Sequence, residues 1–172
     1  MRYVPATAGS DPSFLLKALG EASGELARAF GSVRERDLLR PAGWPDEGWC
    51  LLAVPFHLVQ VERGVQEQAA IIAMSRGREV PEIPHVDFDD IPFEADYAEA
   101  DLELLLDELH YLRRRTTYLL WDLSERDWER KGLHPYRGEV SIVEIARETY
   151  QHDLEHLWQV RRMVDELQGP RG

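Results

Sequence analysis

The chain has 172 residues, of which 44% are hydrophobic and 30% charged, and its formal net charge is −12 at pH 7. This length fits one domain with a core of its own, and no apolar run approaches the roughly 20 residues that span a bilayer. Because the excess acid would repel phosphate backbones, we expect no nucleic-acid partner, and no membrane partner either.

Two features of the chain predict its compartment. The first ten residues contain no apolar signal core. The single cysteine, Cys50, rules out a disulfide within the chain and suits a reducing environment. We therefore expect a cytoplasmic protein.

Apolar residues at helical spacing predict two long helices in the first half of the chain. The first extends from about residue 11 to 31, with Asp11 as N-cap and Pro12 at the first helical position. The second begins near residue 49 or 50 and extends to about residue 74, with Pro55 in its first or second turn. Between them lies a structured loop, with Trp44 and Trp49 as anchors against the bundle end.

The same periodicity predicts two long helices in the second half. The third extends from about residue 96 to 122. A capping box of Ser141 and Glu144 opens the fourth, which ends before Gly169. The intervening segment predicts one short helical turn that starts at Ser124 and stops at Gly132, and we see no strand signal of any length. The four helices predict an all-α, four-helix bundle.

The connection between the second and third helices decides the topology. Residues 75–93 are rich in proline and acid and have no helical period. About 19 extended residues cover some 60 Å, more than the roughly 35 Å length of a 24-residue helix. The connection can therefore return along the whole bundle, which permits parallel second and third helices in an up-down-down-up order. We expect Ile83, Val86 and Phe88 to pack onto the bundle and His85 to lie in a solvated crossover.

Three histidines fall on core-facing stripes. His152 and His156 are four residues apart and therefore lie on one face of the fourth helix, while His57 lies on the apolar face of the second. Three buried neutral imidazoles would be costly unless something joined them, and a divalent metal would do so. The alternative is that His152 and His156 are an exposed or ordinarily hydrogen-bonded histidine pair without metal, since such pairs are common at this spacing.

A metal site of three histidines would leave one coordination position open for water or substrate, as catalytic sites do. Imidazole ligands suit zinc, nickel, copper or iron. The pattern differs from the H-E-x-x-H of zinc proteases because Asp153 follows His152 where the glutamate base would stand. We therefore predict no peptidase.

Several longer stretches of the sequence resemble the DinB superfamily, also described as YfiT-like metalloenzymes. They are G-W-x-x-x-x-V-x-F-H-L-V-Q-V-E from Gly48 to Glu62, the long second connection, D-L-S-E-R-D-W from Asp122, G-L-H-P-Y-R-G-E-V-S-I-V-E-I before and into the fourth helix, and H-D-L-E-H. The resemblance covers nearly the whole chain, from the first helix to about Met163.

This resemblance implies an up-down-down-up four-helix bundle with a divalent metal, zinc or nickel, held by His57, His152 and His156, and commonly a homodimer. Related families include bacillithiol-dependent S-transferases and mycothiol-dependent maleylpyruvate isomerases. The resemblance to these families therefore implies metal-dependent transfer of a small thiol to an electrophile. A non-enzymatic, metal-stabilised stress-response binding module and a metal-dependent hydrolase are the alternatives.

Four further positions carry separate predictions. Cys50 stands where family members often have Ser or Thr at the helix N-cap, and we expect a packed residue there in preference to a reactive thiol. His134 could approach the mouth of the site or cap a loop. We expect Asp153 to point to a neighbouring helix or solvent, and Arg113 to belong to a solvated helix face together with the two arginines that follow it.

Overall fold

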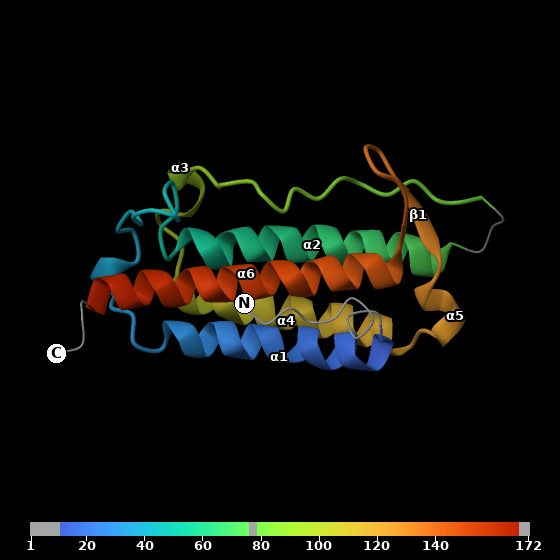
Figure 1. Ribbon diagram of the computed structural model, residues 1–172, viewed down its shortest axis with the longest axis horizontal. Helices are drawn as coiled ribbons and strands as arrows, with labels where there is room; N and C mark the ends of the chain where they lie inside the picture. Colours follow the sequence, from blue (N-terminus) through green and yellow to red (C-terminus); the bar gives the residue numbers. More distant parts are fainter. Residues whose placement is uncertain (1–10, 76–78, 169–172) are drawn as a thin grey trace.

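The structure is a computed structural model that describes residues 11–75 and 79–168. Four long helices of this part of the chain form a bundle, as predicted (Figure 1). They are α1 (Pro12–Phe30), α2 (Ala53–Met74), α4 (Leu102–Trp121) and α6 (Ile142–Gln168). The shorter elements are η2 (Glu35–Asp37), α3 (Glu94–Tyr97), α5 (Glu125–Trp128), β1 (Lys131–His134) and β2 (Gly138–Ser141).

The order of the helices is up-down-down-up. After α2 the chain returns along the length of the bundle and enters α4 at the end where α2 began, so α2 and α4 run parallel (Figure 1). We call this return segment, residues 79–93, the crossover. Helices α1 and α6 run in the opposite direction to that pair (Figure 1). The predicted topology is therefore confirmed.

Two helix starts follow the sequence signals closely. The Asp11 carboxylate accepts a hydrogen bond from the Ser13 N–H at 3.0 Å and caps α1. At the start of α6, the Glu144 carboxylate accepts the Ser141 N–H at 2.8 Å, and the Ser141 hydroxyl accepts the Glu144 N–H at 3.3 Å. The predicted capping box is therefore confirmed.

Two other predicted boundaries were wrong. Helix α2 begins at Ala53 and not at residue 49 or 50, which places Pro55 in the first turn, where its missing N–H leaves no intrahelical bond unmade. The predicted third helix is broken into α3 and α4. Asp101 ends the break, since its carboxylate accepts the Leu104 N–H at 3.0 Å and caps α4.

The expectation of no strands was also wrong. Strands β1 and β2 form an antiparallel hairpin, and Gly132 lies within β1 and does not stop α5, which ends at Trp128. The crossover pairs with β1, because the Ile83 N–H donates to the Leu133 carbonyl at 3.1 Å and the Leu133 N–H donates to the Pro81 carbonyl at 2.7 Å. A Cβ on Gly132 would lie 2.5 Å from an Ile83 methyl, so only glycine permits this approach.

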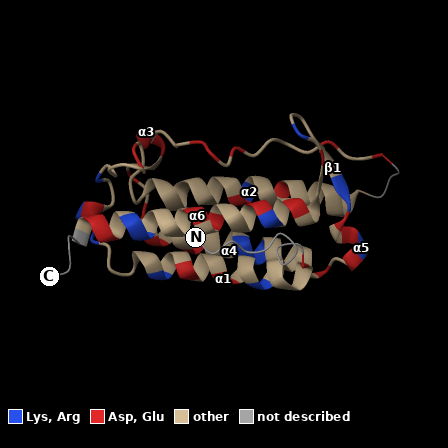
Figure 2. Cartoon of the chain, viewed as in Figure 1, with Lys and Arg blue, Asp and Glu red and all other residues tan. Residues whose placement is uncertain are grey.

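The crossover is acidic on its outer side and apolar beneath. Ile83 and Val86 are buried against the bundle, as predicted, and Phe88 is half-buried. Figure 2 shows acidic residues spaced along this segment and on α3. The sequence has no Lys or Arg between Glu79 and Leu112. Within the described residues, no helix has the length and apolar character needed to cross a membrane.

Candidate metal centre

The three histidines predicted from the core stripes meet between α2 and α6. The His152 Nε2 lies 3.0 Å from the His57 Nε2 and 2.9 Å from the His156 Nε2. The three side chains are only 4%, 6% and 7% exposed for His57, His152 and His156. Antiparallel packing of α2 against α6 thus brings together ring nitrogens that are 95 residues apart in the sequence.

The surroundings keep these imidazoles neutral. Burial, together with the neighbouring His156, lowers the pKa of His57 to about 4. Burial and the two other imidazoles lower the pKa of His152 to about 3, and burial also lowers the pKa of His156. The Trp49 ring packs edge-on against His57 and His156. At pH 7 all three rings therefore offer nitrogen lone pairs without first losing a proton.

A hydrogen bond orients the His156 ring of α6, and a backbone carbonyl approaches the His152 ring. The Gln159 side-chain oxygen lies 2.6 Å from the His156 Nδ1 and accepts its proton, which leaves the lone pair on the His156 Nε2 facing the other histidines. The Phe88 carbonyl, on the crossover, lies 2.9 Å from the His152 Nε2. The buried His152 Nδ1 has no hydrogen-bond partner among the described residues.

This donor set fits a divalent transition metal. Nitrogen ligands about 2.0–2.1 Å from an ion stand roughly 2.9–3.4 Å apart in tetrahedral or octahedral geometry, close to the two distances from the His152 Nε2. Without an ion, the His152 Nε2 has two other ring nitrogens at hydrogen-bond distance, and one neutral imidazole nitrogen cannot satisfy both. These three neutral rings are therefore arranged as ligands would be.

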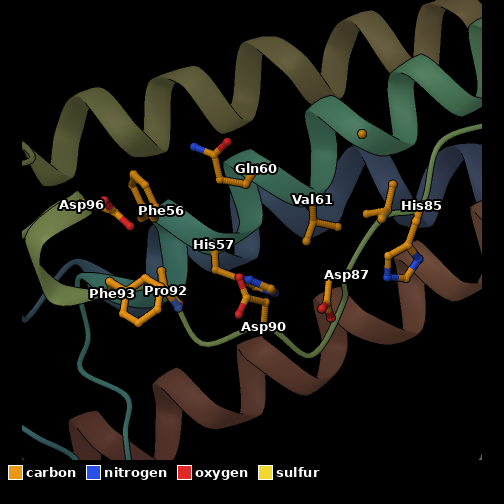
Figure 3. A pocket seen from close by; sticks show the side chains of 12 residues that line it. Phe56, His57, Gln60, Val61, His85, Asp87, Asp90, Pro92, Phe93 and Asp96 are labelled. Carbon is orange, nitrogen blue, oxygen red and sulfur yellow. The ribbon is translucent and has the colours of Figure 1, made fainter.

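A cavity of about 600 Å³ adjoins the cluster, and His57 forms part of its wall (Figure 3). Phe56, Pro92 and Phe93 form an apolar side near α3 (Figure 3). Every charged residue in the wall is acidic: Asp87, Asp90 and Asp96. The cavity has the size and mixed lining of a small-molecule site, and its charge favours neutral or amine-bearing molecules over anions.

A second histidine pair stands at the other end of this cavity. The backbone N–H of Tyr136 donates to the His134 Nδ1 at 3.2 Å, so a neutral His134 carries its proton on Nε2. That Nε2 lies 3.2 Å from the His85 Nδ1 and donates to it, which leaves the proton of His85 on its own Nε2. His85 is solvent-exposed on the crossover, as predicted, and it also lines the cavity (Figure 3).

A buried ion network adjoins the cluster through Asp153. The Arg113 guanidinium donates to both oxygens of Asp153 at 2.5 and 3.1 Å and to the Glu62 carboxylate at 2.9 Å. The Thr116 hydroxyl donates to the other Glu62 oxygen at 2.5 Å. Arg113 is 3% exposed, so placing it on a solvated face was wrong, whereas Asp153 does point to a neighbouring helix.

Burial raises the pKa of Asp153. Although burial disfavours the guanidinium charge, the carboxylates of Asp153 and Glu62 raise the pKa of Arg113, which stays charged. Because Asp153 follows His152, the network holds α6 to α2 and α4 at the level of the histidines.

Cys50, the two tryptophans of the first loop and His110 lie outside the cluster. Cys50 is buried, precedes α2 instead of capping it, and has its sulfur 3.6 Å from the Tyr97 hydroxyl. Trp49 is an anchor, as predicted, but Trp44 is 84% exposed, so its anchoring role was wrong. His110, on α4, has its Nδ1 3.2 Å from the Ser23 hydroxyl on α1.

The fold and the cluster define a helical bundle with a three-histidine site suited to a divalent metal. The family model of the DinB superfamily matches residues 18–160, and the chain belongs to that superfamily. Among solved structures, the chain is similar to one described as "YfiT from Bacillus subtilis is a probable metal-dependent hydrolase with an unusual four-helix bundle topology". The two share 18% identity and a TM-score of 0.75 over 97% of this chain and 91% of that one, a likeness of fold. No curated protein matches the chain.

Sequence reasoning missed three contributors to the site. The Phe88 carbonyl is a backbone atom, so no residue type could have indicated it. Gln159 is three residues after His156 on the same helix face, and that spacing was a usable signal. Arg113 is the first of three consecutive arginines, and the sequence alone does not distinguish it from the two that follow. Its buried acidic partners on other helices would have been the signal.

Proposed function

We propose that His57, His152 and His156 bind one divalent transition metal, zinc or nickel, and that the protein uses it to transfer a low-molecular-weight thiol, such as bacillithiol or mycothiol, to an electrophile. The observation that carries the proposal is the convergence of three buried, neutral imidazoles at the wall of the cavity of about 600 Å³. A catalytic metal site with three protein ligands has a position for a further ligand.

When bound, the metal would favour the thiolate over the thiol at neutral pH and so supply a nucleophile. The protein's own residues would do the rest. Phe56 and Phe93 offer an apolar surface to the electrophile, and the acidic wall favours a thiol or electrophile that carries an amine. The His85 Nε2–H is available to donate a hydrogen bond to a bound molecule. Cys50 is buried against Tyr97, so the reacting thiol would come from a small molecule.

Monochlorobimane with a panel of cellular thiols tests this reaction. In the predicted step the thiol sulfur bonds to the bimane carbon, the C–Cl bond breaks, chloride leaves with the bonding pair, and the thiol proton passes to buffer. We expect metal-loaded protein to consume thiol and bimane together and the His57→Ala variant to do so no faster than buffer. His110→Ala is the control, since His110 is a histidine outside the cluster. Failure of every thiol with the metal-loaded protein would contradict the proposal.

Metal-dependent hydrolysis is the second candidate, and the likeness to a protein described as a probable metal-dependent hydrolase favours it. It predicts turnover of an ester or amide that needs metal but no thiol. A third candidate is the non-enzymatic, metal-stabilised stress-response module. It predicts that His57→Ala lowers the melting temperature while the intact protein shows no turnover in either assay.

A further inference from the structure

The crossover passes over the three-histidine cluster and points one backbone oxygen at it. The Phe88 carbonyl oxygen lies 2.9 Å from the His152 Nε2, and the Phe88 ring packs edge-on against the His152 ring, with 5.0 Å between the ring centres. Burial lowers the pKa of both His57 and His152, and the Phe88 carbonyl opposes this lowering at each ring. The oxygen therefore faces two of the three imidazoles.

The contacts around the His152 Nε2 outnumber the hydrogen bonds that this atom can make. Three polar atoms lie 2.9–3.0 Å from it, namely the Phe88 oxygen and the Nε2 atoms of His57 and His156. A nitrogen of a neutral imidazole makes one hydrogen bond, either as donor or as acceptor, so two of these three contacts lack one. A cation coordinated by all four atoms would account for the three contacts together.

A neighbouring carboxylate fixes the direction of this carbonyl. The Asp89 N–H belongs to the same peptide unit as the Phe88 carbonyl, and it donates to the Asp87 carboxylate at 3.0 Å. In a trans peptide, such as this one, the N–H and the C=O point in opposite directions. Asp87 therefore holds the N–H on one side of the peptide, and the carbonyl oxygen is turned to the other side, towards the histidines.

We propose that the backbone carbonyl oxygen of Phe88 is a fourth protein ligand of the divalent metal, and that Asp87 is the residue that positions it. An oxygen ligand about 2.0–2.2 Å from zinc stands roughly 2.8–3.5 Å from a nitrogen ligand of the same ion, and the distance to the His152 Nε2 lies in this range. Asp87 and Asp90, on either side of Phe88, line the cavity, so the metal would also hold this acidic wall in place (Figure 3).

This inference rests on metal binding in the proposed function and does not depend on thiol transfer. A fourth protein ligand is compatible with a bound substrate, because zinc sites can expand to five ligands. The crossover would then be part of the metal centre, together with α2 and α6.

Selective labelling of the Phe88–Asp89 peptide tests the ligand directly. It is the only Phe–Asp pair in the sequence, so cell-free synthesis with [1-¹³C]Phe and [¹⁵N]Asp gives a single carbonyl–amide correlation in NMR spectra. On titration with Zn²⁺, the Phe88 carbonyl ¹³C resonance should move downfield, because a bound cation polarises the C=O bond. A second sample with [¹⁵N]Gly reports the Phe30–Gly31 peptide at the end of α1, and its resonance should not move.

The same titration separates two failures. A Phe88 carbonyl that stays in place or moves upfield while the protein binds Zn²⁺ would overturn this inference and leave the three-histidine site intact. A protein that binds no Zn²⁺ would overturn this inference and the proposed function together.

Substitution of Asp87 tests its positioning role. Asp87→Ala should weaken Zn²⁺ binding about 10-fold or more in competition with a chelator, and Asp87→Asn, which keeps an acceptor oxygen, should recover most of the affinity. Asp90→Ala removes the same charge from the same wall and should weaken binding less, because within the described residues its side chain makes no hydrogen bond to this peptide. If Asp87→Asn bound Zn²⁺ as weakly as Asp87→Ala, charge alone would explain the loss and the positioning role would be refuted.

Discussion

At the scale of single residues, the centre depends on groups that orient the imidazoles as much as on the imidazoles themselves. The Gln159 side-chain oxygen lies 2.6 Å from the His156 Nδ1 and so fixes the tautomer of His156. Trp49 packs on two of the three rings. Such partners hold a ligand nitrogen in place before the metal arrives. The two residues are therefore separate means of disturbing the site without removing a ligand.

Replacement of Gln159 by leucine should weaken metal binding about 10- to 100-fold, because the His156 Nδ1–H loses its acceptor and the ring loses its orientation. Competition with a chelator of known affinity measures the change. Gln151→Leu, at an exposed position of the same helix, is the matched control and should bind metal like the wild type. Equal affinities for the two variants would rule out an orienting role for Gln159.

The lowered histidine pKa values predict how the metal-free protein responds to acid. With folded-state pKa values of about 4 for His57 and about 3 for His152, below the unfolded value near 6.5, the unfolded state takes up protons first as the pH falls. The free energy of unfolding should therefore fall between pH 6 and 4, by at most about 1.4 kcal/mol per pH unit for each histidine.

Urea titrations of His152→Gln in the presence of a chelator measure how much His152 contributes to the loss of unfolding free energy as the pH falls. This variant should show a shallower loss of stability over the same pH range than the wild type, and His110→Gln should not. A steeper loss for His152→Gln would contradict the assignment of neutral, buried rings.

At the scale of elements, two kinds of contact hold the helices in register around the site. One is the ion network of Arg113 with Glu62 and Asp153, in which one guanidinium serves two buried carboxylates. The other is the close approach of the crossover to α2 at Gly64 and to β1 at Gly132. The ion network places α6 against α2, where His57 lies, and the close approach at Gly64 places the crossover against the same helix.

Arg113→Met should lower the free energy of unfolding by about 3–5 kcal/mol, because it leaves two carboxylates buried and unpaired. Arg28→Met, which breaks the exposed pair with Glu25, should have no measurable effect. Denaturant unfolding at pH 7 compares the two. Similar losses for both variants would show that the buried network contributes no more than a surface pair.

Gly64→Ala should displace the crossover, since the new Cβ would lie 2.6 Å from a Val86 methyl. We expect a destabilisation of about 1–3 kcal/mol, with partial recovery in Gly64→Ala, Val86→Ala. Gly20→Ala on the open side of α1 meets nothing within 4 Å and should stabilise by up to about 1 kcal/mol. If Gly64→Ala stabilised as much as Gly20→Ala, the crossover would not pack as described.

At the scale of the whole molecule, the sequence predicted features set by local patterns and missed those set by contacts between residues far apart in the chain. Helix periodicity was enough for the bundle, and the length of residues 75–93 permitted the up-down-down-up order that the family resemblance implied. The apolar stripes were enough to place His57, His152 and His156 in the core. The hairpin was missed because strands of four residues have too little alternation to recognise, and backbone pairing with Ile83 and Pro81 supports them. The Arg113 network was missed for a similar reason, since its partners lie on two other helices.

Elemental analysis of the protein purified without a histidine tag tests the central claim most directly. We predict one divalent transition metal per chain in the wild type and in His110→Ala, and none in His57→Ala or His152→Ala, with circular dichroism showing that each variant keeps its helices. A wild type that binds no such metal on reconstitution, or a His57→Ala variant that retains the full content, would contradict the assignment of this cluster as a metal centre.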